Sequence, residues 1–188
     1  IDPVEARARK GGPGGLFNGK IHPLIPYALR GVTWYQGEAN TGPAEAEYYQ
    51  HYLKALITDW RKRWNEQLPF AWVQLPNFKR DEKNWPVVRE GMLKTLALPR
   101  TGMAITIDIG DPKDIHPANK QDVGKRLALW ALSTVYGSKV ESYSGPIPAN
   151  HAIKGATISI SFHHAEGGLT AKGGELKEFE VAGTDGVW

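Results

Sequence analysis

The strongest constraint on the fold is an amphipathic helix predicted over residues 43–64, which lies between two short apolar segments. Its apolar residues recur at three- and four-residue steps, the spacing of one helix face: Tyr49, Tyr52, Leu53, Leu56, Ile57, Trp60 and Trp64. Residues 32–35 and 70–75 on either side are rich in β-branched and aromatic side chains, as strands are. We therefore predict a strand–helix–strand unit with the aromatic stripe in its core.

The same alternation continues along the chain. Residues 85–98 carry apolar side chains at helical spacing, and residues 105–108 alternate like the end of a buried strand. Another helix is predicted from Pro117 to about Tyr136. Strands that alternate with helices form a parallel sheet covered by those helices, so the predicted fold class is α/β.

Composition divides the chain into three predicted parts. Residues 1–15 carry charges and a Gly-Gly-Pro-Gly-Gly run, typical of a linker or loop, and residues 16–144 hold the α/β pattern. In residues 145–188, alternation over 156–162, glycine pairs and a further strand at 179–182 predict the start of a β-sandwich accessory domain. These strands are too few to close a sandwich, so residues outside this chain are expected to complete it.

Bulk properties limit the classes of partner. The chain has no cysteine, which removes disulfides and thiolate chemistry, and its net charge of +3 comes from scattered basic residues, so no nucleic-acid partner is expected. No apolar run approaches the roughly 20 residues that span a bilayer, so no membrane partner is expected. The adjacent His163 and His164 lack the spacing of a metal pair, and no metal is predicted. Because residue 1 is not methionine, the chain is expected to have been cut or trimmed, so the lack of a targeting segment carries no information.

The stretch 105–120 carries the first candidate chemistry. A loop rich in Gly, Asp and Pro follows the predicted strand, and His116 stands beside the start of the next helix. The positive end of a helix dipole disfavours a charged imidazole, which suits a proton acceptor. Asp108 and Asp114 are close enough in sequence to orient the ring, as an acid does in acyl-transfer hydrolases. Ordinary loop composition is the competing interpretation.

The stretch 31–40 carries the second group of candidate catalytic residues. A predicted strand breaks at Gly37 into polar residues, and in an open α/β sheet ligands bind beyond the carboxyl ends of strands. Gln36, Glu38 and Asn40 would then project near a cleft, with Gly37 allowing close backbone approach. A strand followed by a polar turn is the alternative.

With both stretches in hand, the chain resembles the sialate O-acetylesterase family, a branch of the SGNH hydrolases. Gly-Val-Thr-Trp-Tyr-Gln-Gly-Glu-Ala-Asn at 31–40 and Ile-His-Pro with Asn-Lys at 115–120 carry much of the likeness. The matching segments cover nearly the whole chain after Gly15: 16–27, 31–40, 108–110, 115–117, 119–120, 124–130 and 144–146. The resemblance implies an SGNH/flavodoxin-like sheet.

It also implies hydrolysis of an O-acetyl ester on a sugar by a serine nucleophile and a histidine base, without a metal or other cofactor. His116 matches the family's histidine. The superfamily's usual acid position, three residues earlier, is Lys113 here, which leaves Asp114 or Asp108. Residues 36–40 match the oxyanion block, with Gln36 and Asn40 as side-chain amide donors, Gly37 as a backbone donor, and Glu38 beside them.

The family's Gly-Gln-Ser-Asn-type block is not found in this sequence. We therefore expect the serine to come from a segment outside this chain, as part of missing N- and C-terminal parts or a separate polypeptide, and the chain alone to be inactive. The substrate would be acetylated sialic acid, acetylated xylan or another acetylated glycan, in a secreted or periplasmic setting. The alternative function is a non-catalytic carbohydrate-binding module, in which Trp34, Tyr35 and Trp85 stack on sugars.

Overall fold

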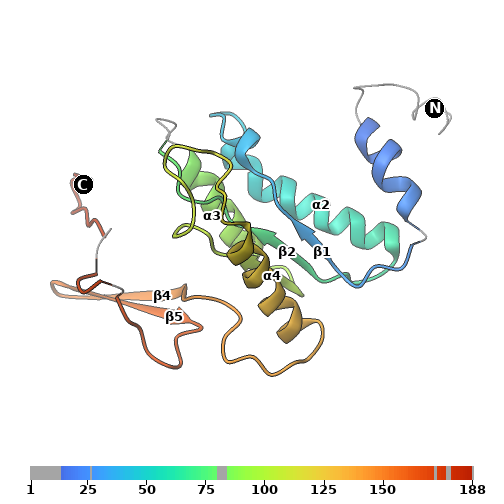
Figure 1. Cartoon of the computed structure of the whole chain (residues 1–188). Helices are drawn as coiled ribbons and strands as arrows, with labels where there is room; N and C mark the ends of the chain where they lie inside the picture. Colours follow the sequence, from blue (N-terminus) through green and yellow to red (C-terminus); the bar gives the residue numbers. More distant parts are fainter. Residues whose placement is uncertain (1–13, 26, 80–83, 172, 177–178, 188) are drawn as a thin grey trace. The chain divides into compact units, whose positions relative to one another are not determined.

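The computed structural model describes residues 14–25, 27–79, 84–171, 173–176 and 179–187, and the chain divides into two compact units, residues 1–144 and 145–188 (Figure 1). Most of the linker predicted over residues 1–15 lies outside the described residues. Within them, no helix is both long and apolar enough to cross a membrane.

The first unit is built on a three-stranded parallel sheet in the order β1-β2-β3. These strands are β1 (Val32–Trp34), β2 (Phe70–Val73) and β3 (Thr101–Ala104). All four residues of β2 are buried, as expected for a central parallel strand whose two faces are covered. The predicted α/β class, a parallel sheet flanked by helices, is confirmed.

Three helices flank this sheet: α2 (Tyr49–Trp64), α3 (Trp85–Thr95) and α4 (Lys120–Thr134). α2 and α3 pack against each other, whereas α4 packs against β2 and β3. A Cβ at Gly102 in β3 would lie 2.1 Å from Nε1 of Trp130, so this position has room only for glycine and lets α4 sit directly on the strand. Shorter helical turns precede β1 and α2: η1 (Phe17–Ile21), η2 (His22–Leu24), η3 (Glu38–Asn40) and η4 (Ala46–Tyr48).

The core lies where α2 and α3 cover the sheet. Its buried residues are Ala46, Tyr49, Leu53, Ile57, Phe70, Trp72, Leu75, Trp85, Val88, Met92 and Met103. Three residues of the predicted stripe, Tyr49, Leu53 and Ile57, are among them, and Leu56 and Trp60 are partly buried against them. Tyr52 was predicted to be in this core, but it is 50% exposed, so that part of the stripe prediction is wrong.

Several predicted boundaries differ from the structure, and three of them have an identifiable cause or size. α2 begins at Tyr49 rather than residue 43, because the intervening chain forms a turn closed on the Gly42 carbonyl and then η4. β3 ends at Ala104 rather than Asp108, since the buried Thr106 hydroxyl donates to the Gln74 carbonyl where a ladder would continue. α4 begins at Lys120 rather than residue 117.

The second unit contains an antiparallel pair of strands, β4 (Ile147–Lys154) and β5 (Thr157–His163), joined through Gly155 at a φ of +58°. A separate antiparallel sheet thus follows the α/β unit. Alternation identified β5, whereas β4 has no such pattern. Residues 179–182, predicted as a further strand, form none in the structure.

Candidate active site

A pocket of about 410 Å³ brings together two loops that are far apart in the sequence. The loop after β1 and the loop before α4 supply its walls: Tyr35, Gln36, Glu38, Ala39, Ile115, His116 and Lys120. Gln36, Glu38 and His116 were predicted site residues, and the structure gathers these three. Gly37, Asn40, Asp108 and Asp114 do not line it, so their positions need separate description.

Hydrogen bonds hold the loop after β1. Tyr49 of α2 donates through its hydroxyl to the Gln36 backbone carbonyl at 2.7 Å and approaches its side-chain Oε1 at 3.3 Å. Gln36 Nε2 donates to Asn40 Oδ1 at 2.6 Å, and Asn40 Nδ2 donates to Glu45 at 3.1 Å. Burial raises the pKa of Tyr49 to about 12, so the phenol stays protonated and remains a donor. The side-chain amides of Gln36 and Asn40 each donate one N–H in these bonds, and the second N–H of each is not used in them.

Gly37 lets this loop lie directly on the core. A Cβ there would stand 2.8 Å from Met92 Cε and 3.1 Å from Leu75 Cδ2, closer than ordinary contact. A side chain at this position would push the Gln36–Asn40 segment away from the core. The close approach at Gly37 is thus to the core side chains Met92 and Leu75, and Gly37 does not line the pocket where its role was predicted.

His116 presents its ring to solvent at the pocket, with a side chain that is 87% exposed. Its Nδ1 lies 3.9 Å from Asp114 Oδ1, and the same oxygen accepts the His116 backbone N–H at 2.8 Å. Asp114 is therefore beside the ring, outside direct hydrogen-bond distance. The residue that caps α4 is Asn119, whose side chain accepts from the Asp122 N–H, so the prediction that His116 sits at or beside the helix cap is wrong by three residues.

Asp108 faces a different partner from the one predicted. Both of its carboxylate oxygens accept from Arg126 of α4, at 2.6 and 2.7 Å. Arg126 also donates to the Ile105 carbonyl. The structure brings Asp108 to this guanidinium rather than to the His116 ring.

Sequence reasoning missed Lys120 as a pocket residue. Its Nζ donates to the Tyr35 hydroxyl at 3.1 Å and lies 4.7 Å from the centre of that ring. The only signal was its place in the Asn-Lys pair after His116, and no spacing rule assigns such a lysine to a site. Ala39 and Ile115 were also missed, because apolar lining residues carry no chemical signature.

The aromatic platform predicted for the alternative function is not assembled. Trp85 is 3% exposed and donates through Nε1 to the Pro76 carbonyl, while Trp34 packs edge-on against Trp60. Of the three proposed stacking residues, only Tyr35 lines the pocket, where it is 39% exposed. No serine is among the pocket residues, and no group of three or more potential metal ligands gathers within the described ranges.

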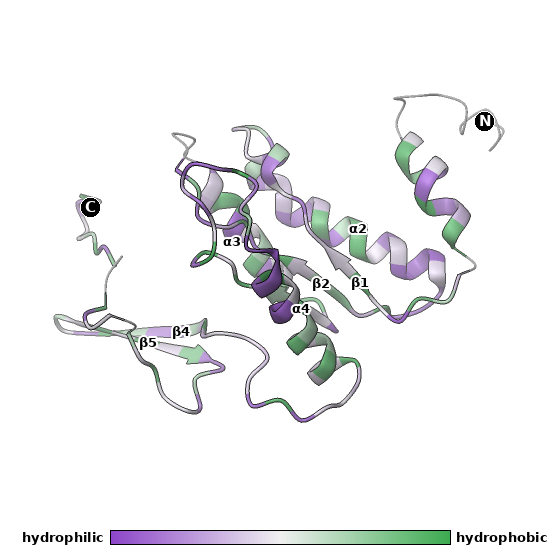
Figure 2. Cartoon of the chain, viewed as in Figure 1, coloured by the Kyte–Doolittle hydropathy of each residue, from purple (hydrophilic) through white to green (hydrophobic). Residues whose placement is uncertain are grey.

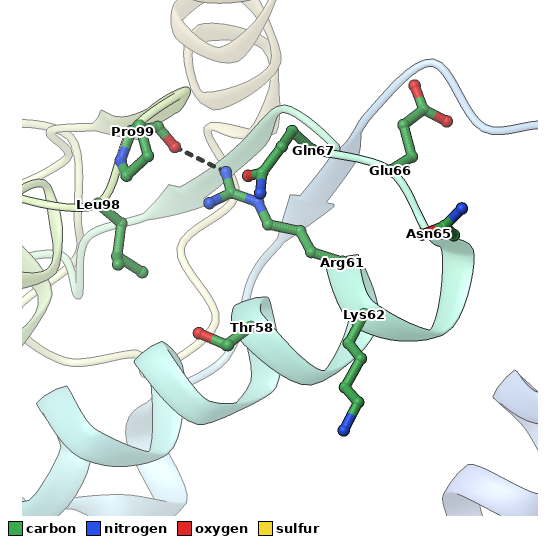
Figure 3. A pocket seen from close by; sticks show the side chains of 8 residues that line it. All are labelled: Thr58, Arg61, Lys62, Asn65, Glu66, Gln67, Leu98 and Pro99. Carbon is green, nitrogen blue, oxygen red and sulfur yellow. Dashed lines mark hydrogen bonds between the residues drawn. The ribbon is translucent and has the colours of Figure 1, made fainter.

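A second cavity, of about 580 Å³, lies where α2 ends and the loop after α3 returns toward β3 (Figure 3). Its buried Arg61 donates through Nε to the Leu68 carbonyl at 3.0 Å and through Nη2 to the Pro99 carbonyl at 2.7 Å. Its guanidinium is thus occupied in joining backbone segments, and no predicted site residue lies here.

Comparison with known proteins places these features in a family. Residues 19–133 match the family described as carbohydrate esterase, sialic acid-specific acetylesterase. The sialate O-acetylesterases of Homo sapiens and Mus musculus are each 34% identical over 154 residues, which covers 71% of this chain and 29% and 28% of those proteins. The crystal structure of a carbohydrate acetylesterase from Xanthomonas citri superposes with a TM-score of 0.76 at 45% identity, covering 79% of this chain and 35% of that one.

The chain therefore spans less than a third of the curated relatives it matches and about a third of the solved structure. The family match covers both loops of the pocket and all three strands of the parallel sheet. This chain belongs to the sialic acid-specific acetylesterase family of carbohydrate esterases.

Proposed function

We propose that this chain is part of a carbohydrate O-acetylesterase and supplies its histidine base and oxyanion loop. The observation that carries the proposal is the shared pocket of His116 and Gln36, which opens to solvent beyond the carboxyl end of β1. The names of the relatives, sialate O-acetylesterase and carbohydrate acetylesterase, support the same activity.

In the proposed mechanism, a serine from a segment outside this chain attacks the acetyl carbonyl. His116 accepts the serine proton and returns it to the departing sugar oxygen, after which water repeats the cycle on the acyl-enzyme. Asp114 is the better-placed acid, because its carboxylate lies beside the ring while both oxygens of Asp108 face Arg126. The second N–H groups of the Gln36 and Asn40 amides, and the backbone of Gly37, are the proposed oxyanion donors.

An O-acetylated sialic acid is the proposed substrate, in preference to a neutral acetylated sugar. Lys120 presents an ammonium group to the pocket, and among the described residues no carboxylate lies within ion-pair distance of it. Its hydrogen-bond partner, the Tyr35 hydroxyl, is neutral and leaves the charge available for a substrate carboxylate. An acetylated xylose backbone is neutral and offers no such group.

The test joins this chain to its upstream segment and measures acetate release from an O-acetylated sialic acid and from acetylated xylan. We expect His116→Ala to lower turnover about 10²- to 10⁴-fold, whereas His51→Ala, at an exposed histidine of α2, leaves it unchanged. Lys120→Met should raise KM for the sialate only. Turnover that survives His116→Ala refutes the catalytic proposal, and sugar binding without any turnover favours the binding-module alternative.

A further inference from the structure

Arg126 joins α4 to the segment that leaves β3. Its Nη1 and Nη2 donate to the two oxygens of Asp108 at 2.6 and 2.7 Å, and Nη1 also donates to the Ile105 carbonyl. Hydrogen bonding to Asp108 raises the pKa of Arg126 above its ordinary value, so the guanidinium stays charged. The Arg126 side chain is 31% exposed, which leaves it partly shielded from solvent. A planar guanidinium held at three points orients its partners as well as attracting them.

These contacts of Arg126 with Ile105 and Asp108 lie at the start of the loop that carries His116. The same loop is anchored again where the Gly110 N–H donates to Asn77 Oδ1 at 2.7 Å. Further along, the Pro112 carbonyl accepts the Lys79 N–H at 3.0 Å, and Ile115 is partly buried against the core. Bonds such as Lys113 N–H to Asp111 at 2.8 Å are local. The exposed His116 ring has no packing of its own to hold it, so its position depends on these anchors. Figure 2 shows that the N-terminal half of α4, which supplies Arg126, is its hydrophilic half.

We propose that Arg126 and Asp108 form a positioning pair that fixes the position of the loop carrying His116 relative to the loop after β1. This inference rests on the proposed esterase function but assigns residues that carry out no chemistry themselves. Asp108 acts through Arg126, and Arg126 acts through the backbone at Ile105 and the Asp108 side chain. The pair therefore sets how far His116 stands from Gln36 across the pocket.

The experiment is a double-mutant cycle in the longer polypeptide that contains the upstream segment. Asp108→Asn and Arg126→Gln are each expected to lower kcat about 100-fold, the size of effect caused by a misplacement of about 1 Å, with KM changed much less. The double variant should lose no more than either single variant, because both break one unit. Arg126→Lys keeps the charge but not the two-pronged contact and should recover only part of kcat.

A second ion pair provides the matched control. Arg63 Nε and Asp59 Oδ2 lie 2.6 Å apart on the surface of α2, and neither residue lines the pocket. Arg63→Gln and Asp59→Asn should change stability by no more than about 1 kcal/mol and leave kcat unchanged. Adding methylguanidinium to an Arg126→Ala variant should restore part of kcat, which a loss of folded protein would not allow.

Two outcomes would overturn the positioning pair. One is a double variant whose losses in kcat multiply, which would mean that Asp108 acts independently, for instance as the acid of His116. The other is an Arg126→Gln variant in which amide hydrogen exchange at Gly110 and His116 keeps the unmodified rate. If the unmodified polypeptide releases no acetate, the proposed function fails, and hydrogen exchange still decides whether the pair holds the loop.

Discussion

The Tyr49 hydroxyl donates a 2.7 Å hydrogen bond to the Gln36 carbonyl, so a core residue of α2 holds the loop that lines the pocket. Tyr49→Phe removes this donor. We expect the free energy of unfolding to fall by about 0.5–1.5 kcal/mol, the usual net contribution of one hydrogen bond, because this bond is part-buried, and turnover to fall as the loop shifts. Chemical denaturation and acetate release measure the two effects. Tyr52→Phe, at an exposed ring on the same helix, is the control; equal behaviour of the two variants would contradict the assignment.

The same phenol makes stability depend on pH in the alkaline range. Burial raises the pKa of Tyr49 to about 12 from 10.0, so the unfolded chain loses this proton first as pH rises. The stabilising contribution is thus fully present below pH 10 and is lost as pH rises from 10 to about 12. Denaturant unfolding at several pH values should show a steeper decline over this window for the unmodified chain than for Tyr49→Phe. An equal dependence of stability on pH in the two proteins would contradict this role of Tyr49.

Gly37→Ala tests whether the oxyanion loop must touch the core. The new Cβ would stand 2.8 Å from Met92 Cε, so the loop or the methionine has to move. We expect a fall in turnover of about 10- to 100-fold that exceeds what the change in stability explains. Gly42→Ala, nearby in the chain with no atom within 4 Å of its new Cβ, should retain activity. An active Gly37→Ala enzyme would mean that the loop tolerates displacement.

Gly102→Ala tests the seating of α4 on the sheet. Its Cβ would lie 2.1 Å from Trp130 Nε1, and moving this buried indole away from β3 costs about 1–3 kcal/mol or more. Gly124→Ala, within α4 and with nothing near its new Cβ, should instead stabilise by roughly 0.5–1 kcal/mol through helix propensity. Thermal and denaturant unfolding of both variants give the comparison. Equal stability of Gly102→Ala and the unmodified chain would contradict the packing described.

Element positions followed from apolar periodicity, but element ends did not. The helix face from Tyr49 to Trp64 repeats over many turns, so its type is clear from sequence. The end of β3 depends on one hydrogen bond, from Thr106 to the Gln74 carbonyl, and the start of α4 on the Asn119 cap. Contacts of this kind join residues that no local pattern relates.

In the candidate site, too, the sequence predicted the segments involved but not the contacts between distant residues. Motif resemblance selected the two loops and, within them, His116 and Gln36, which the structure places on one pocket. It did not separate Asp108 from Asp114, since both precede the histidine by a few residues. Their partners differ because Arg126 of α4 donates to the carboxylate of Asp108, whereas Asp114 lies beside the His116 ring.

The amino-acid sequence by itself determined the alternation of strands and helices and the segments that carry candidate chemistry, because apolar spacing and residue type are local properties of the chain. Only the tertiary structure decided that Lys120 and Tyr35 join His116 in the pocket, that Asp108 pairs with Arg126, and that Trp85 is buried. Those outcomes depend on which distant side chains the packed helices and strands bring within a few ångströms of one another.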